Sequence, residues 1–160
     1  MTLPVRYQQL MWSGEGAYLI AGRSVFLDPE NAKVDASGLV GASERTALVV
    51  TGPDTRELSV TILLLPEPAE DPEPRAGRVA AEVTIEVPDT TLEFYNTTSD
   101  APDVELESPG IYLVRVIVDV GDAGASRLAN ESHTIELTRI GPLRADGAGV
   151  RLARPRTILA

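Results

Sequence analysis

Eight carboxylates follow one another between residues 82 and 107 of this chain without an intervening lysine or arginine. Grouped carboxylates can serve as a general acid and base, as ligands of a hard cation, or as a surface that attracts cations. A glycosidase-type pair needs a concave site that is usually rich in aromatic residues, whereas only 4% of this chain is aromatic. The run therefore favours binding over catalysis, and we predict no catalytic residue and no cofactor.

Seven of these acids are predicted to form one partner-binding face. Two of them, Glu82 and Glu86, lie on the same side of a predicted strand, where we expect them to be exposed. Such a single-sign surface repels nucleic acid and anionic membranes and attracts a basic protein. A solvated face that only confers solubility is the alternative. The predicted residues are Glu82, Glu86, Glu93, Asp100, Asp103, Glu105 and Glu107.

The other candidates for chemistry are weaker. His133 is the single histidine and cysteine is absent, which excludes the usual zinc sites. Ser132 adjoins His133, but neighbours on a strand point to opposite faces, and we expect a partly exposed strand histidine. The loops 100–105 and 119–122 are rich in oxygen ligands but lack the spacing of a calcium-binding EF-hand, so no metal site is predicted.

Length and composition indicate one globular domain. The chain has 160 residues, of which 43% are hydrophobic, and a net charge of −10. Its N-terminus lacks the charged and apolar regions of a signal peptide, and its apolar runs are far shorter than a membrane span. Together with the absence of cysteine, this predicts a cytoplasmic protein with no membrane partner.

Alternating apolar and polar residues predict strands along most of the chain. The strongest pattern is 110–120, whose expected partner is 132–140, with Ile135 and Leu137 on one side. In 79–87 the apolar residues at 83, 85 and 87 share one face. Further strands are expected over 5–12, 17–20, 24–28, 45–51 and 57–65, and one short helical turn within 39–47.

About eight strands separated by turns predict an all-β antiparallel sandwich for residues 1–141. Residues 66–74 contain four prolines and four acids, which predicts an extended, solvated loop. Residues 142–160 carry four arginines against one aspartate, which predicts a flexible basic tail or an arm for a second subunit.

The closing part of the chain has a recognisable outline. Ser108 to Tyr112 (SPGIY) leads into a Val/Arg strand, followed by a polar loop and then by residues 131–137. This outline resembles small bacterial β-sandwich proteins related to competence protein J, the inhibitor of a nuclease that acts when DNA enters the cell. The opening stretch 18–29 is similar to their early strand pair. The turn at 109–112 is one residue tighter here, and the loop 66–74 and the basic tail have no counterpart in that outline.

The resemblance implies a β-sandwich that binds and blocks a protein without chemistry of its own. Combined with the acidic run, it favours an inhibitor or immunity-type binder of a basic partner, such as a nuclease or toxin. The alternative is a structural subunit of a phage or secretion particle. In that case residues 142–160 would dock on the acidic body of a neighbouring copy and build a homo-oligomer.

Overall fold

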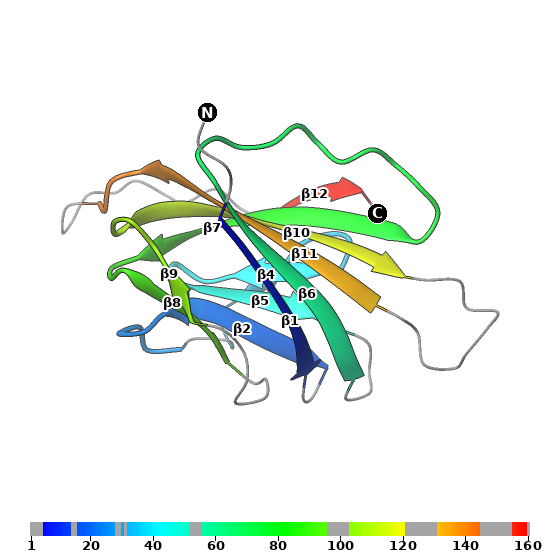
Figure 1. Cartoon of the computed structure of the whole chain (residues 1–160), viewed down its shortest axis with the longest axis horizontal. Helices are drawn as coiled ribbons and strands as arrows, with labels where there is room; N and C mark the ends of the chain where they lie inside the picture. The colour runs from blue at the N-terminus through cyan, green and yellow to red at the C-terminus, as the bar shows by residue number, and fades with distance from the viewer. Residues whose placement is uncertain are drawn as a thin grey trace.

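The computed structural model describes residues 5–13, 16–27, 30, 32–51, 56–95, 103–120, 131–144 and 155–159; for 5–6, 8–13 and 56–57 it describes the backbone alone. These residues form two six-stranded sheets that lie against each other as two layers (Figure 1). The sheets are mostly antiparallel, and the predicted all-β sandwich is confirmed.

Sheet A has the strand order β1-β6-β11-β10-β7-β12. It contains the long strands, whose bounds are β1 (Val5–Ser13), β6 (Arg56–Leu65), β7 (Arg78–Val87), β10 (Gly110–Val120), β11 (Glu131–Gly141) and β12 (Arg156–Leu159). The predicted pairing of β10 with β11 is confirmed, with Val116 opposite Ile135. The inward alternation predicted for β7 is also confirmed, since Val83, Ile85 and Val87 are buried in the core.

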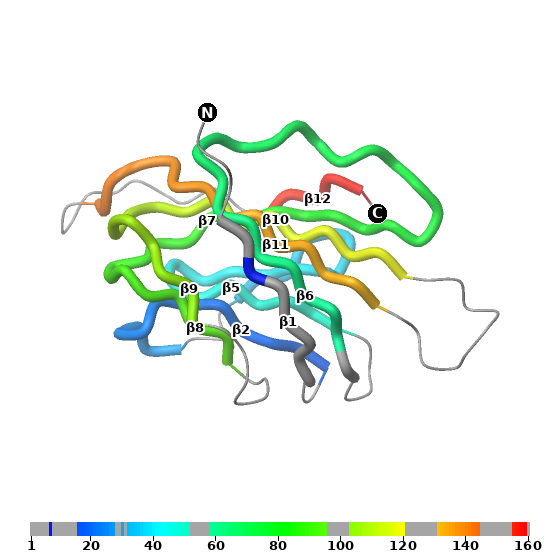
Figure 2. Tube along the Cα trace, viewed as in Figure 1, coloured from blue at the N-terminus to red at the C-terminus, as the bar shows by residue number. Residues whose placement is uncertain are grey.

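One strand pair in sheet A is parallel, and it determines how the chain crosses this sheet. β6 lies beside β11 in parallel register, although 65 residues separate the end of β6 from the start of β11 in the numbering. The chain leaves β6 at Leu65 and enters β7 at Arg78, three positions away in the sheet. Residues 66–77, which we call the crossover, therefore pass over the outer face of β11 and β10 (Figure 2).

Sheet B has the strand order β3-β4-β5-β2-β8-β9 and is built from shorter strands. Their bounds are β2 (Ala17–Gly22), β3 (Lys33–Val34), β4 (Val40–Ala42), β5 (Thr46–Val50), β8 (Thr91–Tyr95) and β9 (Val104–Glu105). The helical turn expected within 39–47 is wrong, because this segment forms β4, a tight turn and β5.

The strand expected over 24–28 is also wrong for its described residues. The backbone N–H groups of Arg23 and Ser24 donate to the Asp89 carboxylate, which turns the chain away from the sheet after β2. Phe26 beyond this turn is 97% exposed. A short apolar stretch forms a strand only where a neighbouring strand accepts its hydrogen bonds, and none lies there in the described structure.

The core lies between the sheets and consists mainly of Val, Ile, Leu and Ala, as the low aromatic content requires. Tyr18 on β2 and Phe94 on β8 are its aromatic members on the sheet B side, with ring centroids 6.1 Å apart. Burial of these side chains supplies the main stabilisation of the fold.

Within the segment 142–160, for which we expect a basic tail, Arg156–Leu159 form β12 at the edge of sheet A, antiparallel to β7. The Thr157 hydroxyl also donates to Asp35 in the β3–β4 connection, at 2.6 Å. Residues 145–154 lie outside the described residues, so the division into a domain and a tail stays a prediction there.

Candidate functional site

The structure describes six of the seven predicted partner-binding acids and places them in separate groups. Glu82 and Glu86 lie on the outer face of β7, whereas Glu93, Asp103 and Glu105 lie on or beside β8 and β9 of sheet B. The remaining two are Glu107, which follows β9, and Asp100, which lies outside the described residues. The acids are contiguous in sequence but do not share one surface.

Two arginines of the same chain form ion pairs with Glu82. Arg115, directly opposite on β10, donates from Nη2 to Glu82 Oε2 at 3.1 Å, and Arg156 on β12 donates from Nε to Oε1 at 2.7 Å. The Glu82 side chain is 14% exposed. Cross-strand neighbours of opposite charge stabilise a sheet, so Glu82 acts here as a structural ion-pair partner.

Arg115 also fastens the crossover to sheet A. It is buried, and its Nη1 donates to the carbonyl oxygens of Ala69 and Glu70 at 2.9 and 3.0 Å. Glu136 on β11 lies 3.6 Å from the same guanidinium. The crossover has mostly exposed side chains and no strand, as predicted for 66–74, yet a buried arginine holds its backbone at residues 69 and 70, and Arg78 holds it again at the Glu73 carbonyl.

Glu86 is buried, contrary to the exposed position expected for it. Arg45 donates to its Oε1 at 3.0 Å and Arg144 to its Oε2 at 2.9 Å. Burial alone would raise the pKa of Glu86, but the hydrogen bonds from Arg144 and Arg45 outweigh it and hold that pKa below its ordinary value. Glu86 therefore joins the β4–β5 turn and the segment after β11 to the end of β7.

Arg23 matches two acids of sheet B. Its Nε donates to Glu93 and its Nη2 to Asp103, the second at 2.7 Å. The hydrogen bonds from Arg23 and from Tyr95 to Glu93 lower the pKa of this carboxyl. This cluster is more exposed than the one at Glu86, since the side chains of Glu93 and Asp103 are 24% and 54% exposed against 7% for Glu86.

Glu105 and Glu107 differ from the four acids above. Both are exposed, and neither forms an ion pair with any residue that the structure describes. The Glu105 carboxylate accepts a long hydrogen bond from the Thr91 hydroxyl, at 3.4 Å, and its charge also acts on Arg23. Of the predicted acids that the structure describes, Glu105 and Glu107 are the two without an ion pair.

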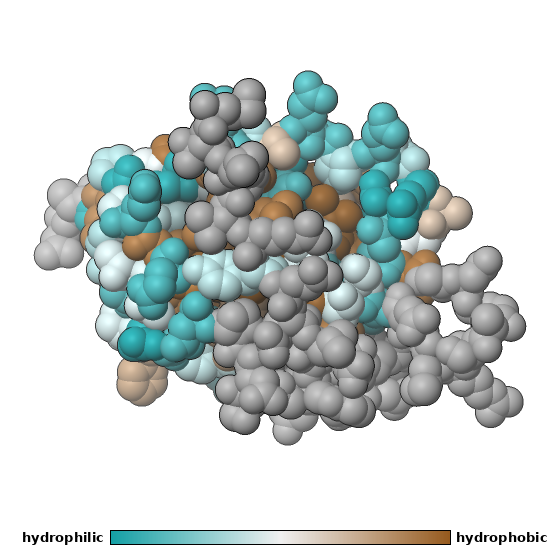
Figure 3. All heavy atoms as spheres, viewed as in Figure 1, coloured by the Kyte–Doolittle hydropathy of each residue, from teal (hydrophilic) through white to brown (hydrophobic). Residues whose placement is uncertain are grey.

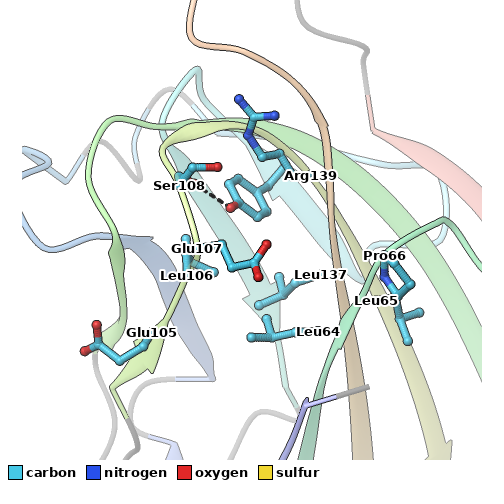
Figure 4. A pocket seen from close by; sticks show the side chains of 10 residues that line it. Leu64, Leu65, Pro66, Glu105, Leu106, Glu107, Ser108, Leu137 and Arg139 are labelled. Atoms are coloured by element: carbon cyan, nitrogen blue, oxygen red, sulfur yellow. Dashed lines mark hydrogen bonds between the residues drawn. The ribbon is translucent and has the colours of Figure 1, made fainter. Parts of the chain in front are cut away.

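Glu105 and Glu107 are both among the residues that line one pocket of about 380 Å³, which we call the leucine pocket, although the Glu105 carboxylate points away from its leucines (Figure 4). It lies where β6, β10 and β11 of sheet A meet the segment that follows β9. Its floor is apolar, and in Figure 4 the Glu107 side chain points toward Leu64 and Leu137. The lining residues are Leu64, Leu65, Pro66, Glu105, Leu106, Glu107, Ser108, Tyr112, Leu137 and Arg139.

The wall of the leucine pocket is built by the SPGIY segment. The Tyr112 hydroxyl donates to the Ser108 carbonyl at 2.6 Å and closes the turn, which burial of the ring supports. Gly110 lies so near β11 that a Cβ atom at this position would be 2.5 Å from the Gly141 carbonyl oxygen. Any side chain at residue 110 would therefore separate β10 from β11 at the edge of the pocket.

His133 is fully buried, so the partly exposed position expected for it is wrong. Its Nδ1 lies 2.8 Å from the Tyr18 hydroxyl, and its Nε2 lies 2.7 Å from Glu131 Oε1. Tyr18 belongs to sheet B and His133 to sheet A, so this polar contact joins the two layers. Burial, with a smaller contribution from the Glu131 charge, raises the pKa of Tyr18 well above its ordinary value.

The described part of the chain offers neither a metal site nor a membrane-spanning helix. Its His, Asp and Glu side chains include no group of three or more that could hold a metal ion. None of its residues belongs to a helix with the length and apolar character needed to cross a membrane.

Sequence reasoning missed the arginine partners and the leucine pocket. The arginines at 23, 45, 115, 144 and 156 are between 33 and 80 residues from the predicted acids they contact. The sequence held a signal for one of these ion pairs, because Arg115 and Glu82 both occupy polar positions of predicted strands, 110–120 and 79–87. No sequence pattern indicated the pocket, because its residues come from four separate segments.

No family model matches the chain, and no curated protein matches it. Among solved structures, ComJ of Bacillus subtilis, an inhibitor of the DNA degrading activity of NucA, is similar with a TM-score of 0.61 and 10% sequence identity. The match covers 87% of this chain and 100% of ComJ. A protein named crocagin biosynthetic gene J is similar with a TM-score of 0.56 and 16% identity, over 86% of this chain and 99% of that one. At these identities the likeness establishes the fold alone, and at that level the predicted resemblance to the competence protein J group is confirmed.

Proposed function

We propose that this chain is an inhibitor or immunity-type binding domain that holds a basic protein partner, such as a nuclease or toxin, without catalysing a reaction. The observation that carries the proposal is the pair of exposed residues Glu105 and Glu107 at an apolar pocket, with which no described arginine forms an ion pair. The fold shared with ComJ, which is itself a nuclease inhibitor, supports it.

The crossover adds to the same charge. Glu67 and Glu70 are exposed and form no ion pair within the described structure, whereas Glu73 lies beside Arg78, whose Nη1 donates to the Glu73 carbonyl at 3.1 Å. The crossover begins at Pro66, a lining residue of the leucine pocket, so its first acid follows the pocket directly in the chain. Acids grouped around an apolar surface attract a cationic protein and accelerate its association, and the rate falls as salt rises.

The proposal is tested with extract from the cell that produces the chain. The extract is passed over the immobilised full chain, and its ability to degrade plasmid DNA is compared before and after passage. We expect the activity to fall, a basic protein to be retained, and the activity of the eluted protein to be suppressed when free chain is added. A retained protein whose activity the chain leaves unchanged, or no retained protein, would contradict the proposal.

The structural-subunit alternative stays a prediction. Its motivation was a basic tail that docks on a neighbouring copy, but in the described part of the tail Arg156 contacts Glu82 of its own chain. Size-exclusion chromatography separates the alternatives: an inhibitor is expected to elute as a monomer, whereas a subunit of a particle is expected to elute as a large assembly.

A further inference from the structure

We propose that the leucine pocket receives one lysine or arginine side chain of the partner, with its aliphatic stem against Leu64 and Leu137 and its charged head at Glu107. This inference rests on the proposed function and names the surface and the group through which the basic partner is held. It also separates Glu107 from the other predicted acids as the residue that makes the contact.

The shape and chemistry of the floor suit an aliphatic stem. Leu137 and Leu106 are buried, Leu64 and Leu65 are half-buried, and all four line the pocket. A volume of about 380 Å³ is at the small end of the range for ligand pockets and suits one long side chain rather than a folded segment. Lysine and arginine place their methylene groups on apolar surface while the charged head stays at the rim.

The charge at the rim is available for such a head. The Glu107 carboxylate points over the leucine floor (Figure 4). The cation nearest in the lining is Arg139, whose Nε donates to the Pro109 carbonyl at 3.0 Å and whose guanidinium points away from Glu107 in Figure 4. Elsewhere the chain supplies its own arginine to Glu82, Glu86, Glu93 and Asp103.

The wall that carries Glu107 is held in place before any partner arrives. Leu106 donates its backbone N–H to the Thr90 carbonyl at 2.8 Å, and Tyr112 anchors Ser108 on the other side of Glu107. A contact residue fixed on both sides loses little conformational entropy on binding. These contacts favour a charged anchor in a preformed pocket over a loop that closes around its ligand.

The first test uses a probe with the proposed chemistry and needs no partner. Butylguanidinium chloride is titrated into the ¹⁵N-labelled full chain, and amide chemical shifts are followed by NMR. We expect saturable shifts at residues 105–108 and at Leu64 and Leu137, about tenfold weaker binding in Glu107→Gln, and unchanged binding in Glu73→Gln. The two variants lose the same charge, and Glu73 lies on the crossover away from the pocket lining. Equal binding by the parent and by Glu107→Gln, or shifts spread evenly over acidic residues, would overturn the inference.

The second test uses the protein retained from the cell extract and separates the two proposals. We expect Glu107→Gln to weaken its binding about tenfold and Glu73→Gln by less than about twofold. If the partner binds both variants equally, the pocket inference is wrong while the proposed function stands. If butylguanidinium binds as expected but no partner is retained, the proposed function fails and the cation preference of the pocket stands.

Discussion

The outer face of sheet A and the leucine pocket both carry carboxylates, but the chain treats them differently. On the sheet, Glu82 and Glu86 each contact two arginines, and the crossover lies over Arg115. At the pocket, Glu105 and Glu107 are exposed and unpaired among the described residues. In Figure 3 hydrophilic side chains stand along the crossover at the upper edge of the molecule, with hydrophobic atoms visible beneath them. The comparison shows that an acid in this chain can join parts of the fold or stay exposed without an ion pair, and that its neighbours decide which.

Removing Arg115 is expected to cause the largest loss of stability on the outer face of sheet A. Arg115→Ala leaves the crossover carbonyls and Glu136 without their donor in a buried setting, so we expect a loss of about 3 kcal/mol in the free energy of unfolding. Urea denaturation measures it. The control is Arg75→Ala, because the Arg75 side chain is 62% exposed and pairs with Asp119 at the surface; its loss should stay under about 0.5 kcal/mol. Equal losses in both variants would show that burial adds nothing to the arginine contacts.

Charge reversal distinguishes the two regions directly. Glu86→Lys places a buried cation beside Arg45 and Arg144, so we expect it to destabilise the fold by about 2 kcal/mol or more. Thermal unfolding followed by circular dichroism gives the change. If Glu86→Lys melts like the parent, Glu86 is not held as the structure shows.

The pH dependence of stability tests whether Glu86 stabilises the fold as an ionised partner of its arginines. Because the folded-state pKa of Glu86 lies below its ordinary value of 4.5, the folded chain binds this proton less readily than the unfolded chain. Its contribution to stability is therefore present above pH 4.5 and is lost as the pH falls through the lowered pKa. We expect the stability difference between the parent and Glu86→Gln to shrink over that window in urea titrations. A difference that is constant with pH would contradict an ion-pair role.

The smallest effect on stability is expected at the pocket. Glu107→Lys makes the same charge change as the reversal at Glu86, but at an exposed site without an ion pair, so the unfolding free energy should change by less than about 0.5 kcal/mol. The same thermal melt measures it. A large loss would mean that Glu107 stabilises the fold and would remove the reason to regard it as available to a partner.

The strands at the centre of the fold could be predicted from the sequence, whereas segments at its periphery could not. The alternation in β7 predicted which side of this strand faces the core, because a strand with one covered face must alternate. The segment around Phe26 has the same apolar character, but Asp89, more than 60 residues away, turns its backbone out of the sheet. Such a long-range hydrogen bond leaves no local pattern.

The site was predictable only in part, for a related reason. The acidic run was visible and includes Glu105 and Glu107, but its lack of basic residues in sequence did not mean a lack of basic neighbours in space. Arg23 reaches Glu93 and Asp103 because β2 pairs with β8, and Arg144 reaches Glu86 from the segment that follows β11. Glu86 in addition was expected at the surface, because sequence alternation does not reveal that the segment after β11 covers the outer face of β7 there.

The parallel pairing of β6 with β11 has a consequence for how the protein is made. When β1 and β6 have left the ribosome, the strand that will lie on the inner side of β6 has not been synthesised, because β11 starts only at residue 131. The edge of β6 that pairs with β11 therefore stays unpaired while β7 and β10 are synthesised. Contacts between segments so far apart in the sequence slow folding. An exposed strand edge in a partly made chain is a site for aggregation. The rate at which the last third of the chain arrives therefore bears on the yield of folded protein.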